Sequence, residues 1–408
     1  MPNEIRSISR KKRLAFYFIV FLIPISTILI LYTAYTAYRT RPIYWYVKSR
    51  QRGWRGKLHR TDAELGFAPV ADAQGAQVFP IGDDVPARYD KDGFRVPLED
   101  TGGASVDRHP IVLALGCSFT YGDATKAEDT YPYLLGKRLG GTAKNAGVGS
   151  YGLSQMLVLA KRLVPTHKPD YLVVQYSPWL VDRARSPFAP VYFGTVPTPY
   201  FFISQNDLTL HAPVFTSRLF DLPFDRYRNT QAGIVDEGSF LWDVGLPLYI
   251  HDDFNLAFFK LRGFFGLVPS PAMDPKQITN YVYEEIARVA RENRAKLVIV
   301  ILGNDYQPVE IPEGAFPADS IMVNAHQALL EHLPVINQET YEKSYFHWRG
   351  SPLRIVDTHP NENAHRIIAE AIINKIQNET QGHWTARNTF ELAAALQIQV
   401  SSRSRSLW

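Results

Sequence analysis

Residues Gly116-Cys117-Ser118-Phe119-Thr120-Tyr121-Gly122 follow directly after the short apolar run Ile111–Leu115. An apolar, β-branched run of this length that ends at a glycine predicts a buried strand, and the polar residues after it predict a turn at its carboxyl end. In open α/β sheets, ligands bind at that end of the strands. Ser118 stands between two glycines that allow a sharp turn, so its hydroxyl can face a cleft. We therefore expect a base for this serine elsewhere in the chain.

The composition bounds the function only loosely. With 408 residues the chain has room for a full core and for more than one structural unit. The net formal charge is only +4, so no nucleic-acid partner is predicted. The single cysteine, Cys117, excludes an intramolecular disulfide and a cysteine zinc cluster.

Residues 14–38 predict a transmembrane helix, preceded by a basic tail over residues 1–13. The 25 residues Leu14–Tyr38 carry no charged side chain, and about 20 apolar residues suffice to cross a bilayer. A cleaved signal peptide fits less well, because the apolar run is too long and no small-x-small cleavage site follows it. Five residues suggest an interfacial aromatic belt: Tyr32, Tyr35, Tyr38, Tyr44 and Trp45.

The positive-inside rule does not orient this helix, because basic residues are equally numerous within about 15 residues of each end. We favour a single-pass membrane protein whose catalytic domain is extracytoplasmic (periplasmic), on the functional grounds given below.

The rest of the chain divides by its pattern. Residues 39–110 combine a juxtamembrane segment with turn signals between short extended pieces, which predicts a β-rich lead-in. Residues 111–378 alternate strands with helices, and strands are expected at Ile111–Leu115, Tyr171–Gln175, Leu297–Leu302 and Leu353–Val356. This alternation predicts an α/β fold with a mostly parallel sheet covered by helices on both faces. Residues 379–408 are expected to form a C-terminal helix, about Thr385–Val400, and a tail.

The alternation is interrupted over residues 186–271, which are rich in Phe, Tyr and Pro. A stretch this long indicates either an insertion that covers or flanks the site, or a packing subdomain. The run His251-Asp252-Asp253 within it looks like a set of metal ligands, but such a run is more often a solvated turn, and we predict no metal site.

Asp357 and His359 are the candidate partners of Ser118. A serine hydroxyl becomes a good nucleophile when a histidine takes its proton, and a carboxylate usually orients that histidine. Both residues follow the last predicted strand, so they are expected at the sheet edge where Ser118 lies. Taken singly, Asp357 is also compatible with a helix cap and His359 with a loop histidine.

Three blocks of the chain together resemble the SGNH/GDSL hydrolase family. They are Gly116 to Gly122, Asn145-Ala146-Gly147-Val148-Gly149 and Asp357-Thr358-His359-Pro360-Asn361, and the match covers about residues 111–378. The resemblance implies that Ser118 is the nucleophile, His359 the general base and Asp357 its orienting partner. It also implies a flavodoxin-like three-layer α/β/α sandwich and ester-directed acyl transfer without a metal or organic cofactor.

The sequence departs from the family where the oxyanion is usually held. Ser150 takes the usual place of a glycine after Gly149, although its N–H can still donate. The expected Gly-x-Asn-Asp is absent from the third block, and Trp179 stands about where the asparagine would, with an indole N–H of different reach. Asn304 belongs to a Gly303-Asn304-Asp305 run one strand too late, which we interpret as the edge of the insertion's return. The last block is also one residue shorter than usual between Asp357 and His359.

The sequence thus predicts a membrane-anchored serine esterase or O-acyltransferase that acts on small, acetyl-like esters through a Ser-His-Asp acyl-enzyme. An envelope polysaccharide is the expected substrate, because an anchored ectodomain with an aromatic insertion suits a bulky partner with stackable sugar faces. The alternative is a catalytically weakened glycan-binding or assembly protein, which Trp179 and the shortened last block favour. The basic, aromatic segment 39–60 suggests a third reading, a lipase at the membrane surface, but membrane anchors explain it adequately.

Overall fold

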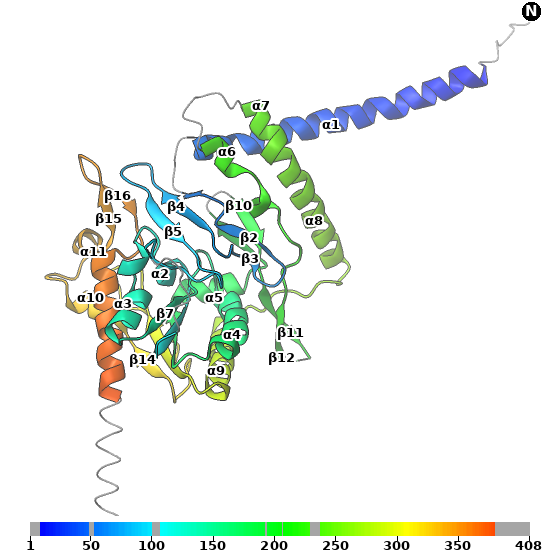
Figure 1. The fold of residues 1–408 in the computed structure, drawn as a ribbon. Helices are drawn as coiled ribbons and strands as arrows, with labels where there is room; N and C mark the ends of the chain where they lie inside the picture. The colour runs from blue at the N-terminus through cyan, green and yellow to red at the C-terminus, as the bar shows by residue number, and fades with distance from the viewer. Residues whose placement is uncertain are drawn as a thin grey trace, which may run out of the picture.

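A parallel five-stranded sheet forms the centre of the protein (Figure 1). The computed structural model describes residues 9–48, 53–99, 107–191, 194–205, 207–228 and 237–379. Every neighbouring pair of strands runs parallel, in the order β14-β13-β8-β6-β7. Their bounds are β6 (Ile111–Leu115), β7 (Thr142–Asn145), β8 (Tyr171–Tyr176), β13 (Lys296–Ile301) and β14 (Ile321–Val323). In chain order this is the flavodoxin-like arrangement, so the predicted α/β class is confirmed.

Helices cover both faces of this sheet. On one face α4 (Leu153–His167) packs along α9 (Pro275–Glu292), where Lys161 pairs with Glu285 at 2.9 Å. On the other face α3 (Tyr131–Arg138) lies beside the C-terminal helix, residues 362–379, and Arg138 pairs with Glu370 at 3.1 Å. The sheet between these helices is buried, and so are all five residues of its strand β6. The shorter helices are α5 (Pro178–Ala184), α10 (Ala325–Glu331) and α11 (Gln338–Tyr345).

The structure corrects two details of the predicted sheet. The last predicted strand, β16 (Arg354–Asp357), pairs antiparallel with β15 (His347–Arg349) and lies outside the central sheet. The sheet instead contains β7 and β14, which the sequence pattern did not reveal. Both are short edge strands, and β7 reads Thr-Ala-Lys-Asn, which lacks the apolar signature of a buried strand.

The segment before the sheet forms two small antiparallel units that pack beneath the Ser118 turn. One contains β1 (Gly53–Arg55), β4 (Gln74–Val78) and β5 (Val85–Arg88), and the other is the pair β2 (His59–Asp62) and β3 (Gly66–Pro69). Trp54, Leu58 and Tyr89 from these units form a buried cluster with Tyr121 of the serine turn. This segment therefore supports the site directly.

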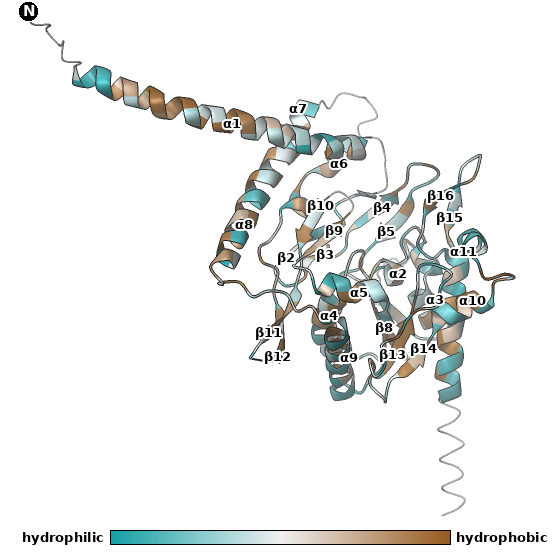
Figure 2. Ribbon diagram, turned by 180° about the vertical axis from the view of Figure 1, so that it is seen from behind, coloured by the Kyte–Doolittle hydropathy of each residue, from teal (hydrophilic) through white to brown (hydrophobic). Residues whose placement is uncertain are grey.

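The N-terminal helix α1 (Arg10–Lys48) is a candidate membrane span. Its apolar portion is long enough to cross a bilayer, and none of its most apolar stretch is buried against the rest of the chain (Figure 2). Tyr44, expected in an interfacial belt, is instead buried in a small cluster with Val47, Phe240 and Val244. The carboxyl end of α1 thus belongs to the folded body.

Residues 186–271 contain two hairpins and several helices. The strands are β9 (Phe188–Val191), β10 (Gly194–Pro197), β11 (Tyr200–Ser204) and β12 (Asp207–His211), and the helices are α6 (Phe224–Arg228), α7 (Glu237–Phe240) and α8 (Leu246–Phe264). A π-helical turn, Leu241–Gly245, joins α7 to α8. The run His251-Asp252-Asp253 lies inside α8, so its interpretation as a turn was wrong.

Several expectations lie outside the described residues. They concern most of the basic tail, the pair Tyr192-Phe193, and the C-terminal helix and tail beyond residue 379.

Candidate active site

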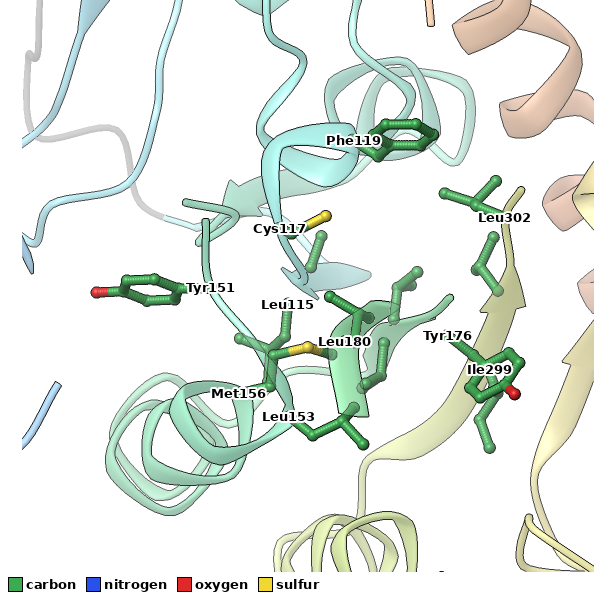
Figure 3. Close-up of a cluster of buried hydrophobic side chains, with 14 of the residues drawn as sticks. Leu115, Cys117, Phe119, Tyr151, Leu153, Met156, Tyr176, Leu180, Ile299 and Leu302 are labelled. Atoms are coloured by element: carbon green, nitrogen blue, oxygen red, sulfur yellow. The ribbon is translucent and has the colours of Figure 1, made fainter. Parts of the chain in front are cut away.

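Ser118 opens the single-turn helix α2 (Ser118–Tyr121), directly beyond the carboxyl end of β6. Gly116 is needed there, because a Cβ atom would lie 2.0 Å from Thr120 Oγ1 and 2.6 Å from Gln175 Oε1. Gln175 of β8 holds the turn: its Oε1 accepts from the backbone N–H of Cys117 at 3.0 Å and from the Thr120 hydroxyl at 2.9 Å. Figure 3 shows Cys117 above Leu115 in the core and Phe119 projecting toward the side of Leu302.

The structure brings Ser118, His359 and Asp357 together. The Ser118 hydroxyl donates to His359 Nε2 at 2.7 Å, and His359 Nδ1 lies 2.7 Å from Asp357 Oδ1. Asp357 is 2% exposed and Ser118 7%, so the chain excludes most water from both. This hydrogen-bonded series lets a proton move from the serine to the imidazole while the carboxylate fixes the ring.

A tight turn explains how one intervening residue suffices between Asp357 and His359. Asp357 Oδ1 accepts both the backbone N–H of His359, at 2.7 Å, and its Nδ1–H. Asn361 fixes the following turn, because its side-chain amide donates to the carbonyls of Ser344 at 3.0 Å and Phe346 at 3.1 Å. These contacts bring the pair to Ser118 even though β16 lies outside the central sheet.

Asp123 is a site residue that the sequence analysis missed. Its Oδ2 lies 3.8 Å from His359 Nε2, and its Oδ1 accepts from Gln77 Nε2 at 2.8 Å. Gln77 belongs to β4 and also accepts, through Oε1, from the backbone N–H of Ala124 at 2.8 Å. The only sequence signal was an acidic residue directly after the last glycine of the serine block.

Arg95 supports the same turn from the lead-in. Its buried guanidinium donates to the carbonyls of Tyr121, Gly122 and Thr125, the last two at 2.7 and 2.5 Å. Burial raises the pKa of the neighbouring Tyr121 phenol, which keeps that ring neutral under the guanidinium. The carboxyl end of α2 is therefore fixed by charge-assisted hydrogen bonds.

The second block packs against the serine turn. Asn145 Nδ2 donates to the Thr120 carbonyl at 3.0 Å, and the Val148 N–H donates to the Gly116 carbonyl at 3.2 Å. Gly147 passes so close that a Cβ atom would lie 2.4 Å from the Tyr121 nitrogen. Gly149, in contrast, has no atom within 4 Å of such a Cβ, and Ser150 adopts a φ of 67°. The block thus changes from close packing to open space within two residues.

Trp179 and Asn304 lie on the rim of the site. The Trp179 ring packs edge-on against Phe119 at 5.1 Å between centroids, and Phe119 packs against the His359 ring at 5.2 Å. Asn304 follows β13, a central strand beside β8, so it is not the edge of an insertion. It lines one narrow crevice with Phe119 and Thr358.

A larger pocket of about 720 Å³ opens beside this rim. Its wall comes from the residues after β8 and after β13, together with the start of α9. Both Trp179 and Asn304 line it, as do five charged residues: Asp182, Arg185, Lys276, Asp305 and Glu310. The pocket adjoins the Ser118 centre through the Phe119–Trp179 contact.

Comparisons with known proteins find similarity among solved structures alone. No family model matches it, and no curated protein matches it. Among solved structures, TesA is similar at 13% identity over 66% of this chain and 98% of its own, with a TM-score of 0.31. A mutant of Axe2, an acetylxylan esterase from Geobacillus stearothermophilus, is similar at 11% identity over 66% of this chain and 95% of its own, with a TM-score of 0.30. A GDSL-like lipase from Bacteroides thetaiotaomicron is similar at 12% identity over 66% and 89%, with a TM-score of 0.27. Likeness of this degree does not bear on the activity of this chain, which must be inferred from its own residues.

Proposed function

We propose that the chain is a serine esterase or O-acyltransferase that acts on small, acetyl-like esters, with Ser118 as nucleophile. The observation that carries this proposal is the hydrogen-bonded series from the Ser118 hydroxyl through His359 to Asp357, with both links at 2.7 Å. A serine, a histidine and a carboxylate in this order form an activated nucleophile on several unrelated folds.

The reaction follows from the geometry. Ser118 Oγ attacks the ester carbonyl while its proton moves to His359 Nε2, and Asp357 stabilises the imidazolium through Nδ1–H. The imidazolium then returns the proton to the leaving alcohol, which leaves an acyl group on Ser118. Water completes hydrolysis, or a second hydroxyl completes transfer, when His359 removes the proton of the attacking group.

The oxyanion would be held by backbone N–H groups of the serine turn and the second block. Among the described residues, the backbone N–H groups of Ser118 and Gly149 have no hydrogen-bond acceptor, so both are available as donors. Ser150 follows in a left-handed conformation that turns the chain at this point. Loss of one such donor typically costs about a hundred- to a thousandfold in turnover.

We place the substrate's bulk in the pocket beside Trp179. An aromatic side chain next to carboxylates and basic groups suits a sugar, since the ring can stack on its apolar face while the polar groups bind its hydroxyls. The proposed substrate is therefore an ester-bearing envelope polysaccharide. With α1 as a single-pass anchor, the catalytic domain would face the periplasm, where such a polymer is found.

A catalytically weakened glycan-binding protein is the second candidate. It is favoured by Trp179, which stands on the rim beside Phe119 and offers no amide in place of the asparagine. The two proposals are distinguished by whether Ser118 acts as a nucleophile.

The test is labelling of the full-length protein in detergent with a fluorophosphonate probe. The wild type is expected to be labelled, Ser118→Ala to lose all labelling, and Asp357→Asn to hydrolyse p-nitrophenyl acetate about ten-thousandfold more slowly. Ser344→Ala, on α11, is the matched control and should behave as the wild type. A folded wild type that remains unlabelled would refute the esterase proposal and leave the binding protein.

A further inference from the structure

Helix α8 carries a row of exposed apolar side chains on one face. Ile250, Phe254, Phe258, Leu261 and Phe264 recur every three or four residues, and each is between 52% and 84% exposed. Phe265 and Leu267 continue the row just beyond the helix, both 64% exposed. Such spacing places the five helical residues on a single stripe. Contiguous apolar surface of this kind usually marks a protein or membrane contact.

The opposite face of α8 already has its partners. Phe259 packs against Phe188 of β9 at 5.8 Å, and Asp252 accepts from the Ser217 hydroxyl at 2.6 Å. Leu248 is buried on this face near the start of the helix. The exposed stripe is therefore not an inner face left open, because the inner face is occupied.

Contacts with α1 fix the position of α8 relative to the candidate membrane span. Asp253 pairs with Arg39 at 2.6 Å and accepts from the Tyr32 hydroxyl at 3.2 Å. The Arg39 guanidinium also lies over the Tyr249 ring, 3.8 Å from its centroid. Beyond these contacts α8 diverges from α1, and in both views it is the part of the body on the side toward which α1 extends (Figures 1 and 2).

Beyond Asp253, which pairs with Arg39, the charges that border the stripe are all basic. From Phe254 to Leu267 the chain has no acidic residue and two basic ones, Lys260 and Arg262, and both are exposed. At about 100° per residue, they fall on opposite borders of the stripe. Long basic side chains there can keep their charge in water while the apolar face enters the acyl region.

We propose that α8 is an interfacial helix that lies in the surface of the membrane crossed by α1. Its apolar stripe enters the boundary between headgroups and acyl chains, and Lys260 and Arg262 bind anionic headgroups. The occupant of this surface is thus an anionic lipid bilayer. The proposal rests on α1 as the anchor and not on the esterase chemistry.

Two attachments hold the body more rigidly than one. A single helix allows the domain to pivot, whereas α1 together with α8 fixes which side faces the bilayer. The helix α2, which carries Ser118, lies near the middle of the body in both views and is not next to α8. Ser118 would therefore lie within the body and outside the lipid, which suits a polymer outside the bilayer better than a lipid within it.

The test uses the full-length protein in vesicles of phosphatidylcholine and phosphatidylglycerol. An environment-sensitive fluorophore is attached at Phe258→Cys on α8, and separately at Leu353→Cys, an equally apolar position that is 67% exposed on the β15–β16 hairpin. Wild-type protein, whose only cysteine is the buried Cys117, gives the background. Lipids with a nitroxide near the headgroup should quench the Phe258→Cys fluorophore at least about twofold more than the Leu353→Cys one.

Equal quenching at the two positions would overturn the proposal. A blue-shifted but unquenched fluorophore at Phe258→Cys would also overturn it, in favour of a second protein copy over the stripe. A fluorophore at Ile23→Cys, inside the apolar part of α1, separates the two membrane claims. If it is quenched by a deeply placed nitroxide while Phe258→Cys is not, only the interfacial helix fails. If neither is quenched, the anchor itself fails.

Discussion

The serine turn and the substrate rim are built in opposite ways although they meet at Phe119. The turn around Ser118 is buried, and groups from three separate parts of the chain bind its backbone: Gln175, Asn145 and Arg95. The rim around Trp179 and Asn304 borders a pocket of about 720 Å³ and lies after two different strands. The backbone of the turn is therefore held in one conformation, whereas the side chains of the rim border open volume.

This difference separates positioning from recognition. A nucleophile and its base must be held to within a fraction of an ångström, which requires packed and hydrogen-bonded neighbours. A pocket for a substrate needs volume and adaptable polar groups instead. We therefore expect substitutions in the turn to act on folding and turnover together, and substitutions on the rim to act on substrate affinity.

Two glycines test the contrast most strongly. Gly116→Ala would place a methyl group 2.0 Å from Thr120 Oγ1, and Thr120 cannot yield easily because its hydroxyl also bonds to Tyr131 at 2.8 Å. The expected cost is about 3 kcal/mol in the free energy of unfolding. Gly149→Ala adds the same methyl group where no atom lies within 4 Å, and its stability should match the wild type. Urea unfolding in detergent measures both, and equal stability of the two variants would contradict the contrast.

The pH dependence of the unfolding free energy tests the lead-in strands that pack beneath the serine turn. Burial lowers the pKa of His59 to about 4, so this histidine is neutral when folded but binds a proton in the unfolded chain below its usual pKa of about 6.5. The unfolded state then holds more protons, and stability falls as the pH falls through this window. The His59 ring packs against Trp54 and Tyr89 of the buried cluster with Tyr121. His59→Phe should remove about 2 kcal/mol of the loss between pH 7 and pH 5.

The measurement compares unfolding free energies at the two pH values. His365, whose pKa burial lowers to about 3, contributes a similar loss in both proteins and cancels in the difference. The exposed His332 provides the control, since His332→Phe should retain the wild-type dependence. An unchanged acid dependence in His59→Phe would show that the cluster beneath the turn does not control the acid response.

The same contrast explains what could be predicted from the sequence. The serine turn and the second block are local patterns with strict spacing, because close packing leaves few alternatives at Gly116 or Gly147. The Asp357/His359 pair is also a local pattern, although it is one residue shorter than usual. The partner residues Asp123 and Gln77 were missed, since their contact depends on how the lead-in folds back onto the core. β7 was missed because Thr-Ala-Lys-Asn carries little apolar signal, and β14 because an apolar run of only three residues is too short to stand out. α8 was missed because its exposed apolar stripe breaks the usual rule that apolar residues are buried.

Substitution of Trp179 has the smallest expected effect. It distinguishes two roles for this side chain, which are substrate recognition on the rim and stabilisation of the oxyanion by the indole N–H. Its ring is separated from His359 by Phe119, with centroid distances of 5.1 and 5.2 Å for the successive contacts, which places it in the pocket wall. Trp179→Phe retains a ring but removes the indole N–H. If the rim serves recognition, KM for an acetylated oligosaccharide should rise about threefold while kcat stays nearly constant, as for loss of uniform binding. Asn304→Ala, on the same pocket, should have the same effect on KM.

A fall in kcat of about a hundredfold with an unchanged KM would contradict this expectation. Loss of one oxyanion donor typically has about that effect, so the result would assign the indole N–H to the oxyanion and place Trp179 with the rigid serine turn.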